Sequence, residues 1–128
     1  DQLKIKGMTI LIATTQMAEA ERMCDRLSLI EKGKILLEGA PEELITDNVG
    51  ANVVEFKVDL ADLDYHLRRI KEHYSYQVYN NRIRIFLESP READKALRVV
   101  MSDEIHVRRA CLDDVFIRIA GYDLHPGP

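Results

Sequence analysis

Residues 75–88 read SYQVYNNRIRIFLE, and this run specifies how the second half of the chain is arranged. After the Asn80-Asn81 pair, apolar and polar residues alternate, so Ile83, Ile85 and Leu87 lie on one face of a strand and the arginines on the other. Asparagine tolerates a positive φ, and two in a row are typical of a two-residue type I′ turn. The run therefore predicts a tight β-hairpin.

The segments on either side of this hairpin show related patterns. A strand is predicted at 52–59, where Val54, Phe56 and Val58 alternate with polar residues, and another at 104–111. Helices are predicted at 60–73, from apolar residues at helical spacing, and at 91–101, after a Ser-Pro start signal. The order β-α-β-β-α-β predicts a ferredoxin-like domain, which is a four-stranded antiparallel sheet with both helices on one face.

A last helix is predicted from Leu112 to about Ala120, with Gly121 at its end. Its apolar stripe is made of four residues: Leu112, Val115, Phe116 and Ile119. Such a stripe is able to cover the second face of the sheet. The favoured interpretation of that face is nevertheless a solvated, charged surface on which Glu55 and Glu88 balance the arginines, and cover by this helix is the second interpretation.

The first fifty residues follow another pattern. The apolar run Met8–Thr14 predicts a strand buried on both faces, as in a parallel sheet, and Thr14 or Thr15 is placed to cap a helix from Gln16 to about Arg26. A hairpin at 27–37 and a helix opened by a proline complete a β-α-β-β-α order. Turn-rich residues 46–50 then separate a domain at 1–50 from one at 51–128, and the fold class is mixed α/β, of the α+β kind.

Composition excludes several classes of protein. Of the 128 residues, 46% are hydrophobic and 31% charged, and the formal net charge is −4. Binding to a phosphate backbone needs a basic excess, so no nucleic-acid partner is expected. His66 and His73 lie two helical turns apart, too far to share an ion, and no metal site is expected. Cys24 and Cys111 have apolar neighbours, which predicts two reduced, partly buried thiols, with a disulfide as the alternative.

The stretch from 9 to 44 resembles a known family. Residues 9–27 read TILIATTQMAEAERMCDRL, which is similar to the switch region in the ATP-binding subunits of ABC transporters. The continuations IEKGKI at 30–35 and EGAPEEL at 38–44 are similar to the hairpin and short helix that follow in that family. The resemblance holds in order and in spacing, so it does not depend on one short motif.

The end of the chain narrows this resemblance. Residues 112–121, LDDVFIRIAG, are similar to the ending of one subgroup, the ATP-binding subunits of ABC-2-type exporters, which include drug-export pumps. Its members carry a small accessory domain, which the resemblance places at 51–128. It also implies a parent subunit that hydrolyses ATP with Mg²⁺ and works with a membrane-spanning permease at the cytoplasmic face of the cell membrane. Since the sequence starts at Asp1, we expect a piece of such a subunit.

Thr15 aligns with the family's histidine that contacts the γ-phosphate of ATP, and Gln16 and Met17 follow it at the start of the switch helix. An imidazole donates a hydrogen bond to that phosphate while it positions catalytic groups. A threonine hydroxyl is shorter and uncharged, so the resemblance implies impaired or differently arranged hydrolysis in the parent. The alternative is that Thr15 is a helix N-cap with no part in the chemistry.

The motifs that bind ATP are absent from the sequence. ABC hydrolysis needs a loop of the type G-x-x-x-x-G-K-[ST], whose backbone N–H groups surround the phosphates. The six glycines are scattered, at 7, 33, 39, 50, 121 and 127, and neither this loop nor the Asp-Glu strand end nor the signature motif occurs. We therefore expect no enzyme activity, and at most weak ATP binding, from the chain alone.

Three roles stay open for residues 51–128. The first is a regulatory or dimerisation module of the transporter, and the second is a small-molecule sensor, by analogy of fold. The third is RNA binding through Arg82, Arg84, Arg108 and Lys57, although that face offers few aromatic residues for base stacking. The acidic pairs at 42–43, 103–104 and 113–114 are expected to face solvent or to favour helix starts, not to catalyse.

The predicted strand Met8–Thr14 also bears on the oligomeric state. A strand from the inside of a parallel sheet has two unpaired edges when its neighbours are missing. Pairing with a second copy of the chain covers those edges, so we expect a homodimer.

Overall fold

The computed structural model describes residues 2–100, 102 and 104–120. These residues form two sheets and six α-helices, so the predicted α+β class is confirmed. Within them, no helix is long and apolar enough to cross a membrane. In chain order the elements are α1 Gln2–Ile5, α2 Met17–Met23, β1 Leu27–Glu31, β2 Lys34–Gly39, α3 Pro41–Asn48, β3 Asn52–Lys57, η1 Leu60–Asp62, α4 Leu63–Ile70, β4 Ser75–Tyr79, β5 Arg82–Leu87, α5 Pro90–Val99, β6 Ile105–Arg109 and α6 Leu112–Ala120.

The larger sheet is antiparallel throughout, with the strand order β4-β5-β3-β6. Its two central strands, β3 and β5, pair along their full length, starting with Asn52 opposite Leu87. Asn80 and Asn81, between β4 and β5, have φ values of 46° and 59°, as a type I′ turn requires. The tight hairpin and the element order predicted from the sequence are therefore confirmed.

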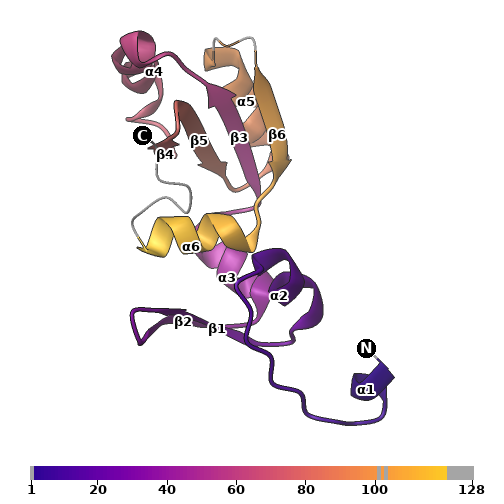
Figure 1. Ribbon diagram of the computed structural model, residues 1–128. Coiled ribbons are helices and arrows are strands. Elements are labelled where there is room, and N and C mark those ends of the chain that lie inside the picture. Colours follow the sequence, from indigo (N-terminus) through magenta and orange to yellow (C-terminus); the bar gives the residue numbers. More distant parts are fainter. Residues whose placement is uncertain (1, 101, 103, 121–128) are drawn as a thin grey trace.

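Helices α4 and α5 lie on one face of this sheet, as expected, and enclose the first hydrophobic core (Figure 1). Ile70 of α4 and Ala96 of α5 close this core from the helix side. From the sheet side it is filled by fully buried residues of the two central strands: Val54, Phe56, Ile83 and Ile85. Burial of one such side chain stabilises the fold by about 1.5–3 kcal/mol, so the alternation in the sequence selects the face that becomes the core.

Helix α6 lies below the lower ends of the strands in Figure 1, between the sheet and α3, and packs on the other face there. Its Leu112, Val115 and Phe116 form a second hydrophobic core with Val53 and Phe86, which point away from the first core. Residues of the first half complete this core: Leu29, Ile45 and Val49. Helix α6 therefore covers the part of this face that carries Val53 and Phe86, although Ile119 of its predicted stripe is 37% exposed. Lys57 and His106 on the same face are exposed, so the face is neither fully covered nor fully solvated.

The predicted strand Met8–Thr14 is wrong. These residues are extended but belong to no sheet, and they are exposed, Leu11 at 99% of its surface. A strand exists only where a neighbour completes its hydrogen-bond ladder. The two described strands of the first half, β1 and β2, pair with each other as the predicted hairpin, and neither pairs with this run.

The predicted threonine cap of helix α2 is also wrong. The helix is shorter than expected, and its N-cap is Gln16, which makes no side-chain capping hydrogen bond. Thr14 instead closes a local turn, because its Oγ1 accepts a hydrogen bond from the backbone N of Gln16 at 3.0 Å. A threonine hydroxyl that accepts a hydrogen bond from the residue two positions later stabilises the turn before the helix. It does not cap the first backbone N–H groups of the helix.

Gly50 joins the two halves at a point where no side chain fits. Its φ is +95°, and a Cβ added there would lie 2.7 Å from the carbonyl oxygen of Leu87. That oxygen already accepts a hydrogen bond from the backbone N of Ala51 at 2.9 Å. We predict that Gly50→Ala lowers the free energy of unfolding, measured in urea, by about 3 kcal/mol, from backbone strain and displacement of β5.

The matched control is Gly33→Ala in the β1–β2 turn. Gly33 also has a positive φ, +77°, but nothing lies within 4 Å of an added Cβ. This variant carries the strain without the collision, and we expect it to lose about 1 kcal/mol. Equal losses for the two variants would show that the approach of Leu87 is unimportant.

Candidate functional site

The segment that the resemblance singles out is a bend before helix α2. Thr15 and Gln16 are exposed, and Met17, the first residue of α2, is half-buried against the second core. A hollow of about 220 Å³ lies beside this segment, lined by Ile12, Thr14, Glu19, Ala20, Met23 and Cys24. Thr15 is not among the lining residues. Its place beside the γ-phosphate of ATP stays a prediction.

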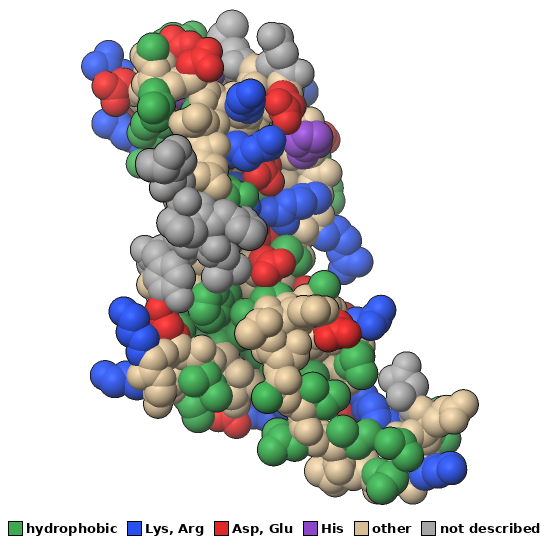
Figure 2. Space-filling view, viewed as in Figure 1, with side chains coloured by type: hydrophobic (Ala, Val, Ile, Leu, Met, Phe, Trp, Pro, Cys, Tyr) green, Lys and Arg blue, Asp and Glu red, His purple; other side chains and the backbone are tan. Residues whose placement is uncertain are grey.

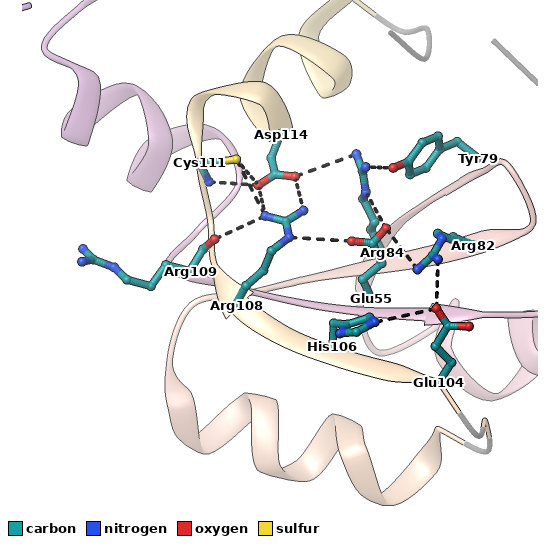
Figure 3. Close-up of polar contacts among 10 residues, drawn as sticks. All are labelled: Glu55, Tyr79, Arg82, Arg84, Glu104, His106, Arg108, Arg109, Cys111 and Asp114. Atoms are coloured by element: carbon teal, nitrogen blue, oxygen red, sulfur yellow. Dashed lines mark hydrogen bonds and ion pairs between the residues drawn. The ribbon is translucent and has the colours of Figure 1, made fainter. Parts of the chain in front are cut away.

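Four charged side chains on the second face of the sheet form a closed ring of ion pairs (Figure 3). Arg108 of β6 donates two hydrogen bonds of 2.8 Å to the carboxylate of Asp114 on α6, from Nη1 and Nη2. Glu55 of β3 lies 3.7 Å from Nε of Arg108 and 3.6 Å from Nε of Arg84 on β5. Nη1 of Arg84 lies 3.9 Å from Asp114 and closes the ring. This ion ring links three strands to the helix that covers them.

Asp114 is the most deeply buried member of the ring, with 1% of its surface exposed. Burial alone would raise the pKa of its carboxyl, but hydrogen bonds from Arg108 and from the backbone N of Cys111 outweigh burial and hold the pKa below its usual range. The hydrogen bonds between Arg108 and Asp114 also raise the pKa of Arg108. Because the pKa of Asp114 is lowered by folding, its ionisation stabilises the fold near neutral pH, and this contribution is lost as pH falls through the folded-state pKa.

Arg84 is held by charge and by an aromatic ring. Only 7% of its surface is exposed, and its guanidinium carbon lies 3.7 Å from the centre of the Tyr79 ring. Its Nη2 donates a hydrogen bond to the Tyr79 hydroxyl. Its Nε and Nη1 have no hydrogen-bond partner in the described part of the chain, so the ion pairs to Glu55 and Asp114 compensate the buried charge.

A second pair of charges extends the ring along the sheet. Arg82 donates a hydrogen bond of 3.0 Å to Glu104, which lowers the pKa of the Glu104 carboxyl, and it also lies 3.9 Å from Glu55. Figure 2 shows the result as basic and acidic side chains mixed over this side of the sheet. All three arginines considered for RNA binding are thus paired with carboxylates. This pairing compensates the charge of the three arginines and so weakens the electrostatic argument for RNA binding, to which the exposed Lys57 was the fourth contributor.

The sequence found some members of the ring and missed others. Glu55 is a counterion of the arginines, as expected, but Glu88 is exposed and in no ion pair among the described residues. Asp114 was expected to face solvent or to lie at a helix start, beside Asp113. It does lie at the start of α6, but it is buried, so the predicted exposure is wrong. Helical spacing puts Asp114 opposite the apolar stripe of α6, so no sequence signal marks its burial. The helix is buried on more than one side, which periodicity alone does not reveal.

The two cysteines are free and half-buried, as predicted. The Cys111 thiol donates a hydrogen bond of 3.3 Å to Asp114, and burial together with the negative charge of Asp114 raises the pKa of Cys111. A raised pKa keeps the sulfur protonated, which is the reverse of an activated nucleophile. Among the described residues, no three His, Cys, Asp or Glu side chains are grouped so that they could hold a metal ion.

The fold and the ion ring define a structural module in which helix α6 is fixed on a four-stranded sheet. Comparison with known proteins shows which proteins the chain is similar to. The chain is 35% identical, over 95% of its length, to the Nod factor export ATP-binding protein I of Bradyrhizobium diazoefficiens and to that of Burkholderia lata, and 32% identical to that of Mesorhizobium japonicum. No protein-family model matches the chain.

The chain therefore corresponds to the C-terminal part of an ABC-type ATP-binding subunit, and the resemblance predicted from the sequence is confirmed. It spans 36–40% of the length of these three relatives. Membership of the ABC-2-type, drug-exporter subgroup stays a prediction.

We predict that Asp114→Asn lowers the free energy of unfolding by about 3 kcal/mol, measured in urea at neutral pH. The substitution keeps the size of the side chain but leaves Arg84 and Arg108 with one counterion, Glu55, and removal of one partner of a buried pair typically costs this much. The loss should shrink below the folded-state pKa of Asp114, where the native carboxyl is protonated as well.

The control is Asp113→Asn, which makes the same change one residue earlier in α6. Asp113 is exposed, and partial burial together with the nearby Asp114 raises the pKa of Asp113. Folding therefore disfavours the ionised form of Asp113. Removal of this charge should leave the free energy of unfolding unchanged or raise it slightly. If both variants lose the same free energy, the ring is not the source of the effect.

Proposed function

We propose that this chain is the C-terminal part of the ATP-binding subunit of an ABC exporter, of the ABC-2 type, and that residues 51–128 act in it as an accessory, regulatory module. The observation that carries the proposal is the similarity to export ATP-binding proteins over 95% of the chain, which includes both the segment before α2 and the sheet domain. The charged side chains of this module pair with one another and hold its own helix α6 in place. This arrangement fits a regulatory role better than a catalytic one.

The proposal places ATP and Mg²⁺ in the rest of the subunit, outside this sequence, with Thr15 facing the γ-phosphate. A membrane-spanning permease subunit is the proposed partner, at the cytoplasmic face of the membrane. The small-molecule sensor stays an alternative with less support. Two hollows in the described part of the chain are lined by residues between 12 and 43, which lie outside the sheet domain.

A homodimer is the proposed oligomeric state. The support is the exposed apolar stretch of the first half, in which Ile10, Leu11 and Ile12 are 43%, 99% and 49% exposed. Burial of such residues against a second copy removes apolar surface from water. We predict that the chain sediments as a dimer at micromolar concentration, and that Leu11→Asp shifts it toward the monomer. A wild-type monomer over that range would contradict the dimer.

The test of the proposed function uses the full-length subunit that ends in this sequence. We expect its upstream sequence to contain the G-x-x-x-x-G-K-[ST] loop and the purified subunit to hydrolyse ATP, whereas the 128-residue chain alone binds ATP weakly or not at all. We further predict that Thr15→His raises the turnover number of the full-length subunit. The histidine side chain is longer than that of threonine, so its imidazole N–H is able to donate a hydrogen bond to the γ-phosphate.

Two results would decide against these statements. A full-length protein without the phosphate-binding loop and without ATP hydrolysis would refute the proposed function. Hydrolysis at equal rates by the wild type and by Thr15→His would leave the function intact and refute the role of position 15. Thr14→His, one residue earlier, is the control for a histidine introduced merely nearby.

A further inference from the structure

One hydrogen bond connects helix α2 to helix α6 across most of the chain. Oε1 of Glu21 accepts it from the backbone N of Leu112 at 2.9 Å, and the two residues are 91 positions apart. Leu112 is the first residue of α6, where backbone N–H groups have no partner inside the helix. A carboxylate there satisfies one of these groups and interacts favourably with the helix dipole. Glu21 thus gives α6 a partner that its own sequence does not supply.

Helix α2 has few local means of holding its position. It is seven residues long, and its N-terminus has no side-chain cap. Helices this short are marginal unless tertiary contacts hold them. Those contacts include the packing of Met17 and Ala20 on the second core, the bond from Glu21, and a hydrogen bond of 2.9 Å from Nζ of Lys4 to the backbone O of Met23. Of these, the bond from Glu21 makes the position of α2, and of the bend at Thr15 before it, depend on α6.

The other side of this connection is rigid. Leu112 is fully buried, and two residues further along α6 Asp114 is fixed by the ion ring to three strands of the sheet. A shift of α2 relative to α6 must therefore break the Glu21 bond or move the ring with it. Packed cores and charge networks of this kind have discrete arrangements instead of deforming continuously.

We propose that Glu21 is a positioning residue, which couples the segment at Thr15 to α6 and the sheet domain through its hydrogen bond to Leu112. The inference rests on the proposed function where it concerns ATP turnover, and on the structure alone where it concerns the coupling. The sheet domain acts on the proposed phosphate-contact segment through this bond, without touching the nucleotide.

The same helix offers a matched control. Glu19 is also a glutamate of α2, but it is exposed, and no hydrogen bond from it to α6 occurs in the described residues. Glu21→Ala removes the acceptor, Glu21→Gln keeps an amide oxygen in the same place, and Glu19→Ala removes an equal charge without the bond. A general effect of charge or of helix propensity would change the measured exchange and turnover rates of the Glu19 and Glu21 variants by the same amount.

The first experiment uses the 128-residue chain and amide NMR. We expect Glu21→Ala to speed hydrogen exchange of the Leu112 amide about tenfold, the loss of one hydrogen bond to a charged group, while Glu21→Gln and Glu19→Ala exchange as the wild type does. Thr15→His should shift amide resonances of α6 in the wild-type and Glu21→Gln backgrounds but not in Glu21→Ala. Equal shifts in the Glu21→Ala background, or none in the wild type, would overturn the coupling.

The second experiment measures ATP turnover of the full-length subunit. We expect Glu21→Ala to lower kcat about fivefold with KM for ATP little changed, Glu21→Gln to restore it, and Glu19→Ala to leave it unaltered. Wild-type turnover in Glu21→Ala would refute the inference and leave the proposed function standing. A full-length subunit without any turnover would refute the proposed function, and the NMR result would then decide on the coupling alone.

Discussion

The bidentate bond between Arg108 and Asp114 is the constraint on which the second half of the structure depends. Asp114 is almost fully buried, and a buried carboxylate without a partner is strongly unfavourable. Apolar burial is non-directional, so it specifies the placement of α6 less strictly than paired charges do. The carboxylate meets both Arg108 and Arg84 in one placement of α6, across three strands (Figure 3). The hydrophobic contacts hold the helix down, and the ion ring fixes where it lies.

The placement of α6 in turn organises the first half. Leu29 of β1 and Ile45 of α3 have their core against α6 and the second face of the sheet, and the Glu21 bond ends on the same helix. The boundary predicted at 46–50 is therefore a boundary in the sequence, while the second core extends across it. Gly50 makes this arrangement feasible, because it lets the chain turn within contact of the β5 backbone.

The sheet domain was predictable because local patterns agree with its tertiary contacts. Alternation selects the buried faces of β3 and β5, the paired asparagines form the turn, and the Ser89 side chain accepts a hydrogen bond from the backbone N of Glu92 at the start of α5. The failures have one physical cause, which is dependence on distant partners. Residues 8–14 become a strand only beside a neighbour, and Asp114 is buried because of arginines on two strands. Neither condition is written in the local sequence.

Charge and apolar surface are divided between the two halves, which bears on how the chain contacts other proteins. The ion ring contains two arginines and two carboxylates, so the sheet face carries little net field for attracting a charged partner. Exposed large apolar residues occur in both halves but are denser in the first, over the N-terminal arm at the lower right of Figure 2 and on the hairpin: Leu3, Ile5, Met8, Ile10, Leu11, Ile12, Ile30 and Ile35. Exposed apolar residues of this kind are more stable when protein covers them. In the proposed full-length subunit, the rest of the ATP-binding subunit would meet this chain at its first half, next to Thr15, and cover this surface. The proposed homodimer would cover the surface when the chain is by itself. The sheet domain would then lie on the far side of α6, joined to the nucleotide-dependent part by α2, α3 and the bond from Glu21.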